Sequence, residues 1–357
     1  MSLADRLKAE IAATGPISVA DYMARCLFDP EDGYYATRPA LGEEGDFITA
    51  PLVSQMFGEL VGLWAAETWV RLGKPARVLL VEMGPGDGTL MSDALRAARL
   101  APEFVNAAEL WLVEPSDPLR SLQEEALAGA TLSPSWSPDC GALPEGAPVI
   151  LLANELLDCL PARQFLRTDH GWAERLVGLD AEGELEFGLF PSPRPDGAPP
   201  DLEPGLVWEV SPAQRALGGE VGARIARNGG AALFIDYGRD RPGPGDTLQA
   251  LRRHARVNLF AEPGTADLTV WADFPAFLAE AREAGAATGL LDQAAFLRRL
   301  GVEARAAALV AARPDRAETI ARQLARLVEP DQMGQLFKAA AIWSKDAPPP
   351  PGFEDLA

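Results

Sequence analysis

The chain contains few cysteine and histidine residues. Its 357 residues include three cysteines, Cys26, Cys140 and Cys159, and two histidines, His170 and His254. The cysteine count is odd and no pair has the Cys-x-x-Cys spacing, so we do not expect a disulfide framework. A structural zinc ion requires four Cys or His ligands in a recognisable spacing, which is missing here. We therefore expect no bound metal.

Basic residues are also scarce, with 32 Lys and Arg against 52 Asp and Glu and a formal net charge of −20. Such a surface repels nucleic acids and anionic membranes, and accommodates a cationic partner more easily. The short basic run LRRHAR at residues 251–256 is better interpreted as an exposed helix face than as a nucleic-acid site. His254 within it is a candidate base or a solvated surface residue.

No apolar run reaches the roughly 18 residues that a membrane-spanning helix needs. The first 15 residues lack the apolar stretch of a signal peptide and the composition of a transit peptide. These absences predict a cytoplasmic protein. A hydrophobic content of 48 % over this length is typical of one large globular domain or two ordinary ones.

Short apolar runs alternating with helical stretches are present from residue 77 onwards. The runs are VLLV (78–81), LWLV (110–113), VILLA (149–153) and ALFIDY (232–237). Continuous apolar strands separated by helices predict a mostly parallel sheet covered on both faces, that is, a Rossmann-like α/β core. One helix has clear ends, with Ser211 as N-cap, Pro212 at its first position and Gly229 after its end.

The remaining segments suggest a domain map. Residues 1–75 are expected to form an N-terminal helical cap, with helices near 19–27 and 53–72 and a long segment at 29–51 that is functional or disordered. The core is expected at 76–240, with a hairpin insertion near 160–210. Residues 241–345 are expected to form a helical lobe, with helices near 274–285, 292–300 and 315–328, plus an antiparallel last strand at 336–343. The Pro-rich tail at 346–357 is expected to be disordered.

The stretch LLVEMGPGDGTL (79–90) predicts a nucleotide site. A strand carrying Glu82 turns through a loop into a helix, and glycines there allow tight turns and close approach of a ligand. The loop residues expected to bind the cofactor are Gly84, Pro85, Gly86, Gly88 and Thr89.

The charge of this loop indicates which nucleotide. Its spacing is GxGxG rather than the dinucleotide pattern GxGxxG, and the carboxylates of Glu82 and Asp87 would repel a pyrophosphate. S-adenosylmethionine carries a sulfonium and an ammonium group and no phosphate, so it suits the loop. A glycine turn that binds nothing, and an NAD site, remain alternatives. Glu114, at the tip of the second strand, is expected to accept the ribose hydroxyls, or else to be a solvated loop residue.

Polar residues follow the next two strands. Asn154, Glu155 and Asp158 come directly after the strand at 149–153, where ligands bind in open α/β sheets. Carboxylates orient a guanidinium by bidentate hydrogen bonds, and methyl transfer depends mainly on alignment. We predict that these three residues are catalytic, with Asn154 also facing the methyl donor; the alternative is an ordinary helix start. Asp236 and Tyr237 end the next strand and are predicted to contact the substrate, or to serve as a cap and a core-edge residue.

Together these stretches resemble the MidA-like, or NDUFAF7-like, family of S-adenosylmethionine-dependent methyltransferases, in a bacterial form. The matching motifs, in chain order, are DGYY (32–35), GDFITAP (45–51), SQMFGEL (54–60), VEMGPGDGTLM (81–91), NELLDCLPARQF (154–165), IDYG (235–238), GDTLQA (245–250), PGTADLT (263–269) and MGQLFK (333–338). They extend over nearly the whole chain.

The resemblance implies a class I methyltransferase fold, S-adenosyl-L-methionine as donor and a protein arginine as acceptor. Mitochondrial members are linked to symmetric dimethylation of an arginine on the 49-kDa subunit of NADH dehydrogenase, so it also implies a part in complex I assembly, and it is compatible with a homodimer. By the same resemblance, residues 45–60 would cover the cofactor, with Gln55 and Gly58 near it and Asp46 and Thr49 near the substrate.

Three positions depart from the family pattern. Asp87 stands where members often have Arg, Leu156 and Leu157 replace a common Phe-Phe pair, and residues 271–273 are Trp-Ala-Asp in place of His-Val-Asp. Two other functions stay open at this stage: an NAD-dependent oxidoreductase, and a non-catalytic assembly factor that retains the fold.

Overall fold

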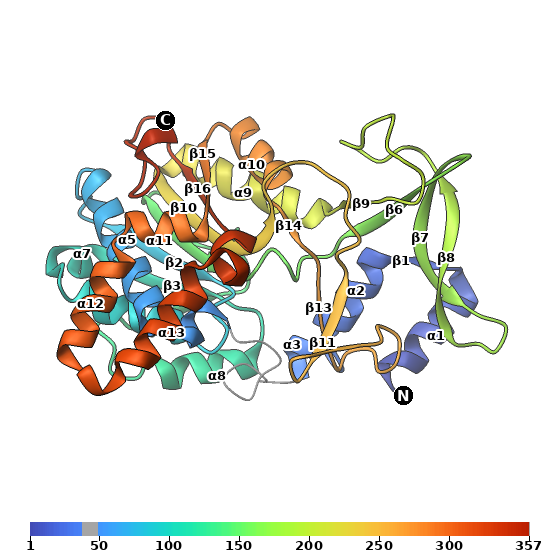
Figure 1. The fold of residues 1–357 in the computed structure, drawn as a ribbon, viewed down its shortest axis with the longest axis horizontal. Helices are drawn as coiled ribbons and strands as arrows, with labels where there is room; N and C mark the ends of the chain where they lie inside the picture. Colours follow the sequence, from blue (N-terminus) through green and yellow to red (C-terminus); the bar gives the residue numbers. More distant parts are fainter. Residues whose placement is uncertain (38–48, 357) are drawn as a thin grey trace.

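The computed structural model describes residues 1–37 and 49–356. Within them the largest sheet has eight strands, seven of which follow the order β15-β16-β10-β5-β2-β3-β4, while the short β14 pairs with β10 (Figure 1). These strands are β2 (Val78–Met83), β3 (Ala108–Val113), β4 (Ser135–Ser137), β5 (Val149–Asn154), β10 (Gly230–Arg239), β14 (Ala272–Asp273), β15 (Ala287–Asp292) and β16 (Phe337–Trp343). β16 runs antiparallel to both of its neighbours. The expected antiparallel last strand and the mostly parallel α/β sheet are therefore confirmed.

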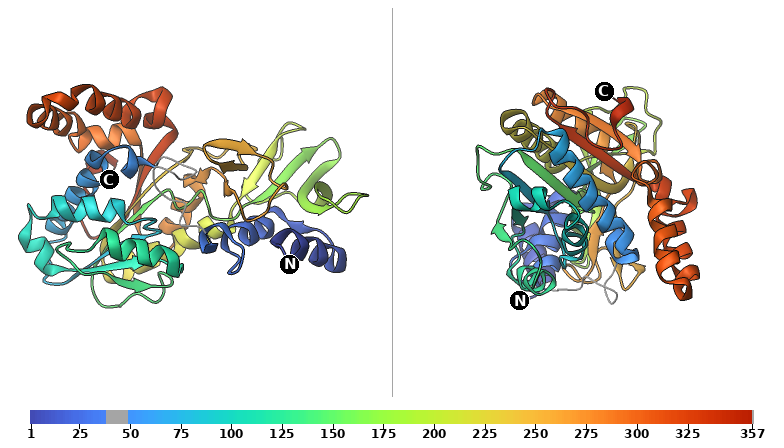
Figure 2. Two further views of the ribbon diagram at one scale, coloured as in Figure 1. Left: turned by 90° about the horizontal axis from the view of Figure 1, so that it is seen from below. Right: turned by 90° about the vertical axis from the view of Figure 1, so that its left-hand side faces the viewer.

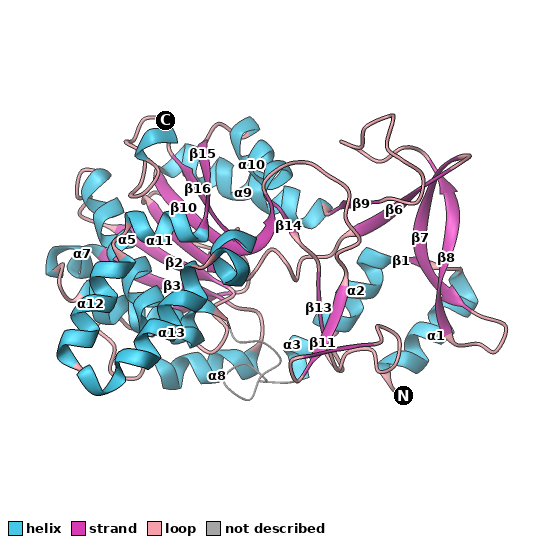
Figure 3. Ribbon diagram, viewed as in Figure 1, coloured by secondary structure: helices cyan, strands magenta, loops and turns pink. Residues whose placement is uncertain are grey.

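Helices cover both faces of this main sheet (Figure 3). They are α5 (Gln55–Arg71), α6 (Thr89–Ala98), α7 (Pro102–Ala107), α8 (Asp117–Ala126), α9 (Pro212–Asn228), α10 (Phe274–Glu283), α11 (Gln293–Arg299), α12 (Val302–Ala312) and α13 (Ala317–Val328). Alternate residues of β2 enter different cores: Leu80 packs in the core that contains Trp64 of α5, and Leu79 in the core that contains Phe277 of α10. Burial on both faces is the reason why the strands read as continuous apolar runs.

A second lobe extends from one end of the main sheet and holds the N-terminus (Figures 1 and 2). Its elements are α1 (Leu3–Thr14), β1 (Ile17–Ser18), α2 (Val19–Phe28), β6 (Arg163–Thr168), β7 (Gly171–Leu179), β8 (Leu185–Ser192), β9 (Val207–Val210), β11 (Gln249–Arg252), β12 (Ala255–Val257) and β13 (Asp267–Thr269). β7 and β8 form the predicted hairpin. The lobe has its own hydrophobic core, to which Leu7, Met23, Val177 and Leu268 contribute.

This lobe corrects the expected domain map. Residues 1–75 do not form one helical cap, because α1 and α2 bury Leu7 and Met23 in the second lobe whereas α5 buries Phe57 and Trp64 under the main sheet. The N-terminal helices, the hairpin insertion and the β11 to β13 segment instead share one core. Two further short helices, α3 (Tyr34–Thr37) and α4 (Ala50–Val53), lie on either side of residues 38–48 in the chain.

The expectation of a disordered tail is wrong for residues 346–356. Phe353 is fully buried, with its ring centroid 5.6 Å from that of Phe296. The Trp64 indole N–H donates to the Pro351 carbonyl at 3.1 Å, and Arg71 pairs with Glu354 at 2.8 Å. A proline-rich composition suggested disorder, but one buried aromatic ring and a few backbone carbonyls hold the segment. None of the helices in residues 1–37 and 49–356 is both long and apolar enough to cross a bilayer.

Candidate active site

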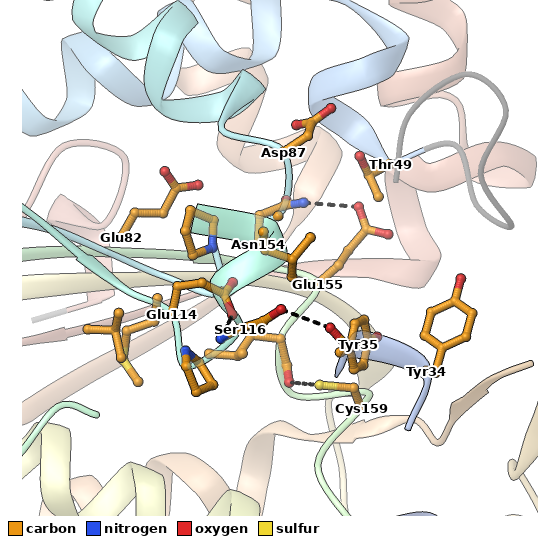
Figure 4. A pocket seen from close by; sticks show the side chains of 18 of the residues that line it. Tyr34, Tyr35, Thr49, Glu82, Asp87, Glu114, Ser116, Asn154, Glu155 and Cys159 are labelled. Carbon is orange, nitrogen blue, oxygen red and sulfur yellow. Dashed lines mark hydrogen bonds between the residues drawn. The ribbon is translucent and has the colours of Figure 1, made fainter. Parts of the chain in front are cut away.

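A cavity of about 770 Å³ lies at the carboxyl ends of β2, β3 and β5, where the main sheet meets the second lobe (Figure 4). Its walls come from the loops after these strands, from α3 and α4, and from Asp267 at the start of β13. The volume is in the range of small-molecule and cofactor sites. Strand ends of the main sheet and residues far away in the sequence therefore meet in one space.

The glycine loop forms one wall of the cavity. Gly84, Gly86 and Gly88 have φ angles of 62°, 55° and 84°, which favour glycine, and a Cβ on Gly84 would lie 2.9 Å from the Leu156 side chain. Gly84, Pro85 and Gly86 line the cavity, whereas Gly88 and Thr89 are outside the lining and turn the chain into α6. Asp87 also lines the cavity, and its Oδ1 accepts a hydrogen bond from the Thr89 amide at 2.9 Å. Asp87 thus satisfies the first amide of α6, whose N-cap is Gly88.

Two carboxylates at the ends of β2 and β3 line the same wall. Glu82 is 2 % exposed, and its Oε2 has no hydrogen-bond partner among the described residues. Burial and the charge of Asp87 raise the pKa of Glu82 well above its usual range. Glu114 is also buried; its Oε1 accepts the Ser116 amide at 2.8 Å. Its burial rules out the solvated-loop alternative and raises its pKa.

The three residues predicted to be catalytic all line the cavity. The Asn154 side-chain amide donates to Glu155 Oε1 at 3.0 Å, and the same oxygen accepts the Ala50 amide at 3.2 Å. Glu155 has a φ of 52°, which is uncommon for a residue with a side chain and marks local strain. Residues 155–160 form no helix, so the helix-start alternative is wrong. The strained turn directs Asn154, Glu155 and Asp158 into one space.

Burial controls the protonation of these acids. It raises the pKa of Glu155 to about 8, assisted by the charge of Asp158, and it raises the pKa of Asp158 to about 6. The amides of Ala50 and Asn154 act in the opposite direction on Glu155 because they stabilise its charged form. Perturbed carboxyl groups of this kind in a cleft are typical of functional sites.

The structure corrects the prediction that Asp236 and Tyr237 contact the substrate. Asp236 is 1 % exposed, and its Oδ2 accepts the amides of Leu157 and Asp158 at 2.8 and 3.2 Å, while Oδ1 accepts the Tyr237 amide at 2.8 Å. Tyr237 is buried with its ring centroid 5.5 Å from that of Phe337. Both are outside the cavity lining. Asp236 is a cap that holds the turn carrying Asp158, because its carboxylate satisfies backbone amides.

The residues at 45–60 that were predicted to lie near the cofactor or the substrate are placed differently by the structure. Thr49 lines the cavity. Gln55 is exposed on α5, with its amide nitrogen 3.4 Å from Glu59 Oε1, so the structure does not place it at the cofactor. Gly58 serves helix packing, because a Cβ there would lie 2.5 Å from the Asp93 Cβ. Asp46 lies outside the described residues.

Several cavity residues were not singled out from the sequence. Tyr34, Tyr35, Ser116, Cys159 and Asp267 all line it. The Tyr35 hydroxyl donates to Asp267 Oδ1 at 3.1 Å, and the Ser116 hydroxyl donates to the Tyr35 carbonyl at 3.0 Å. The DGYY motif was a signal for the two tyrosines. No local pattern connects residue 35 with residue 267.

The lining is strongly acidic. Seven carboxyl side chains border the cavity, and no Lys, Arg or His is among its described lining residues; the seven are Glu82, Asp87, Glu114, Asp117, Glu155, Asp158 and Asp267. A carboxylate oxygen on Glu82 with no hydrogen-bond partner among the described residues, and a loop whose Gly84 and Gly86 line the cavity without a side chain, fit a cationic nucleotide. S-adenosylmethionine meets this description, and Glu82, the glycine loop, Glu114 and Asn154 would hold it.

Comparisons with known proteins agree with this geometry. Residues 60–290 match the family model of S-adenosyl-L-methionine-dependent methyltransferases. The chain is 37 % identical to the protein arginine methyltransferase NDUFAF7 of Bos taurus, covering 93 % of this chain and 81 % of the relative, and 35 % identical to the homologue of Drosophila melanogaster, covering 96 % and 85 %.

A solved structure from Burkholderia thailandensis, bound to S-adenosyl-homocysteine, is 31 % identical with a TM-score of 0.88 and covers 98 % of this chain and 94 % of its own. The expected class I fold, family and methyl donor are therefore confirmed. These matches are to methyltransferases and do not support the oxidoreductase alternative. The chain belongs to the family of S-adenosyl-L-methionine-dependent methyltransferases.

Proposed function

We propose that this methyltransferase transfers the methyl group to an arginine side chain of a partner protein. The observation that carries the proposal is the acidic cavity, in which Glu155 and Asp158 lie beside the residues that suit the donor. The mammalian and insect relatives are named as protein arginine methyltransferases. A guanidinium is the side-chain cation that carboxylates hold in a fixed plane.

The role of each acid follows from its surroundings. Glu155 is held by Asn154 and the Ala50 amide, so its second oxygen, Oε2, is the one that would face the acceptor. Asp158 is positioned through its backbone amide by Asp236. Two carboxylates can offset the charge of a guanidinium and align one nitrogen with the donor, and alignment is the main part of catalysis for such a displacement.

When bound, S-adenosylmethionine supplies a methyl group on a sulfonium sulfur. A nitrogen that took this methyl group in exchange for the sulfur would also have to release a proton. Glu155 is suited to take this proton because burial raises its pKa to about 8. Its carboxylate form is the one that accepts, so kcat/KM for the acceptor is expected to rise with pH towards about 8.

The test is transfer of labelled methyl groups from S-adenosylmethionine to two acceptors. One is the purified 49-kDa-type subunit of NADH dehydrogenase that the sequence resemblance suggests, and the other is a protein extract from cells without this enzyme. Mass spectrometry should find methylarginine, with product formation by a Glu155→Gln variant slower by about 10² to 10³-fold. Methyl groups on lysine or on carboxylates would overturn the arginine acceptor. S-adenosylhomocysteine binding without transfer to either acceptor would favour the assembly factor.

Complex I assembly, cytoplasmic location and a homodimer are parts of the same proposal. The name NDUFAF7 of the relatives supports the first only by implication. Loss of assembled NADH dehydrogenase in cells that lack the enzyme, cell fractionation and sedimentation of the purified chain would test the three in turn.

A further inference from the structure

One buried side chain contacts both segments that suit the methyl donor. Gln123 of α8 is 0 % exposed, and its Nε2 donates to the Gly86 carbonyl at 2.8 Å and to Glu114 Oε2 at 3.3 Å. Gly86 belongs to the glycine loop after β2, and Glu114 follows β3. Gln123 does not line the cavity itself, so its side-chain amide would act on the donor through the residues that accept its hydrogen bonds.

The orientation of the Gln123 amide is determined by Trp136. The indole N–H of Trp136 lies 2.9 Å from Gln123 Oε1. An indole nitrogen can only donate a hydrogen bond, so it must face the amide oxygen. The NH₂ group of Gln123 is therefore directed at Gly86 and Glu114, where both of its protons have acceptors.

α8 also packs directly on the glycine loop. A Cβ on Gly88 would lie 3.3 Å from the Gln123 Cα and 3.2 Å from the Ala126 Cβ. The helix backbone and the loop thus touch, and little space remains for the loop to move towards α8. The Gln123 side-chain amide is buried and has all its hydrogen-bond partners, so it fixes the distance between the glycine loop and the segment that carries Glu114.

We propose that Gln123 is a positioning residue of the donor site, which holds Gly86 and Glu114 in their mutual arrangement, and that Trp136 keeps its amide in the required orientation. This inference concerns donor binding, so it is independent of the proposed arginine acceptor. Removal of both hydrogen bonds should release the Glu114 carboxylate and the Gly86 carbonyl together.

The experiment is calorimetric titration with S-adenosylhomocysteine, which needs no acceptor protein. Gln123→Leu should raise its Kd about 10-fold, equivalent to about 1.4 kcal/mol. The matched control is Gln164→Leu, because Gln164 is also 0 % exposed and also hydrogen bonded, to Glu209 and Arg175 in the second lobe. Gln164→Leu should lower the melting temperature about as much as Gln123→Leu does, and should leave the Kd for S-adenosylhomocysteine unchanged. An equal rise in both variants, or in neither, would overturn the proposal.

A double-mutant cycle shows whether Gln123 acts through Glu114. If it does, Glu114→Gln combined with Gln123→Leu should bind S-adenosylhomocysteine within about 3-fold of Glu114→Gln alone. If the two substitutions instead raise Kd by the product of their separate factors, Gln123 does not act through Glu114. Should Gln123→Leu fail to fold, Trp136→Phe carries the test: freeing the amide should raise Kd about 3-fold, and an unchanged Kd in that folded variant would refute the assigned role.

Discussion

The two sides of the cavity differ in how the chain builds them. The donor side, defined as Glu82, the glycine loop and Glu114, comes from two adjacent strand ends of the main sheet. The acceptor side, defined as Glu155, Asp158, Tyr35 and Asp267, combines one strand end with the second lobe. Figure 4 shows Glu82 and Glu114 on one side of the view, and Glu155 and Tyr34 on the other.

This difference indicates how the two sides can vary. The donor side rests on the register of two adjacent parallel strands and on the positive φ angles of the loop glycines. The acceptor side depends on how the second lobe packs. The departures from the family pattern fall on both sides, because Asp87 lies in the glycine loop and Leu156 packs against Gly84. Leu157 and Trp271 lie nearer the acceptor side, next to Asp158 and to Val270, whose amide donates to the Asp158 carbonyl. Leu157 is buried, whereas Trp271 is 39 % exposed. Acceptor choice is therefore expected to respond to the second lobe without loss of donor binding.

The sharpest separation of the two sides should come from Glu155→Gln. Loss of the proton acceptor is expected to lower kcat by about 10² to 10³-fold, while Kd for S-adenosylhomocysteine stays within about 3-fold. Methylation kinetics and calorimetry measure the two quantities. Glu174→Gln is the matched control, since Glu174 is a buried acid paired with Arg163 at 2.5 Å in the second lobe, and it should leave kcat unchanged. A fall in donor affinity alone would remove Glu155 from the acceptor side.

The donor side should be broken by Gly86→Val. Gly86 lines the cavity, and a β-branched residue at its φ of 55° is strained by about 1–3 kcal/mol, so the loop should change shape and S-adenosylhomocysteine affinity should fall about 100-fold. Gly73→Val controls for strain alone, because Gly73 has a φ of 84° and open space around it, away from the cavity. Normal S-adenosylhomocysteine binding by folded Gly86→Val would refute the assignment of the loop.

Tyr35→Phe should produce a smaller effect, confined to the acceptor side. It removes the hydrogen bond to Asp267 and keeps the backbone carbonyl that Ser116 uses. We expect kcat/KM for the acceptor to fall about 3 to 10-fold, with unchanged donor affinity. Tyr22→Phe is the control, since its hydroxyl donates to the Leu259 carbonyl in the core of the second lobe. A change in donor affinity in Tyr35→Phe would show that the two sides are not separable at this residue.

The smallest expected effect is on stability as a function of pH. Between pH 6 and 8 the folded chain retains a proton on Glu155, whose pKa burial raises to about 8, while the unfolded chain has lost it. Stability should therefore fall as the pH rises through this window, with the melting temperature about 2–4 °C lower at pH 8 than at pH 6. Glu155→Gln should show a smaller decrease. An increase in melting temperature over this range would contradict the assignment of a buried, protonated Glu155.

Local patterns were sufficient for the main sheet and the donor side. Strand positions could be read from apolar runs because burial on both faces of a strand leaves no polar alternation. The N-cap Ser211 was visible for a similar reason, since its hydroxyl accepts the Gln214 amide three residues later. Glycine spacing and Glu82 are also local features, so the chemistry of the donor followed from sequence.

Long-range packing decided the remaining features. No periodicity connects Tyr35 with Asp267, or Gln123 with Gly86 and Trp136, because these contacts form only when separate segments pack. The role of Asp236 likewise depended on the turn after β5. The amides of Leu157 and Asp158 in this turn donate to its carboxylate, which therefore does not line the cavity. The proline-rich composition of residues 346–356 suggested disorder, but burial of Phe353 against Phe296 orders this segment. The sequence by itself determined the strands and the donor loop; the tertiary structure decided which distant side chains complete the site, because burial and hydrogen-bond partners exist only after the two lobes have packed.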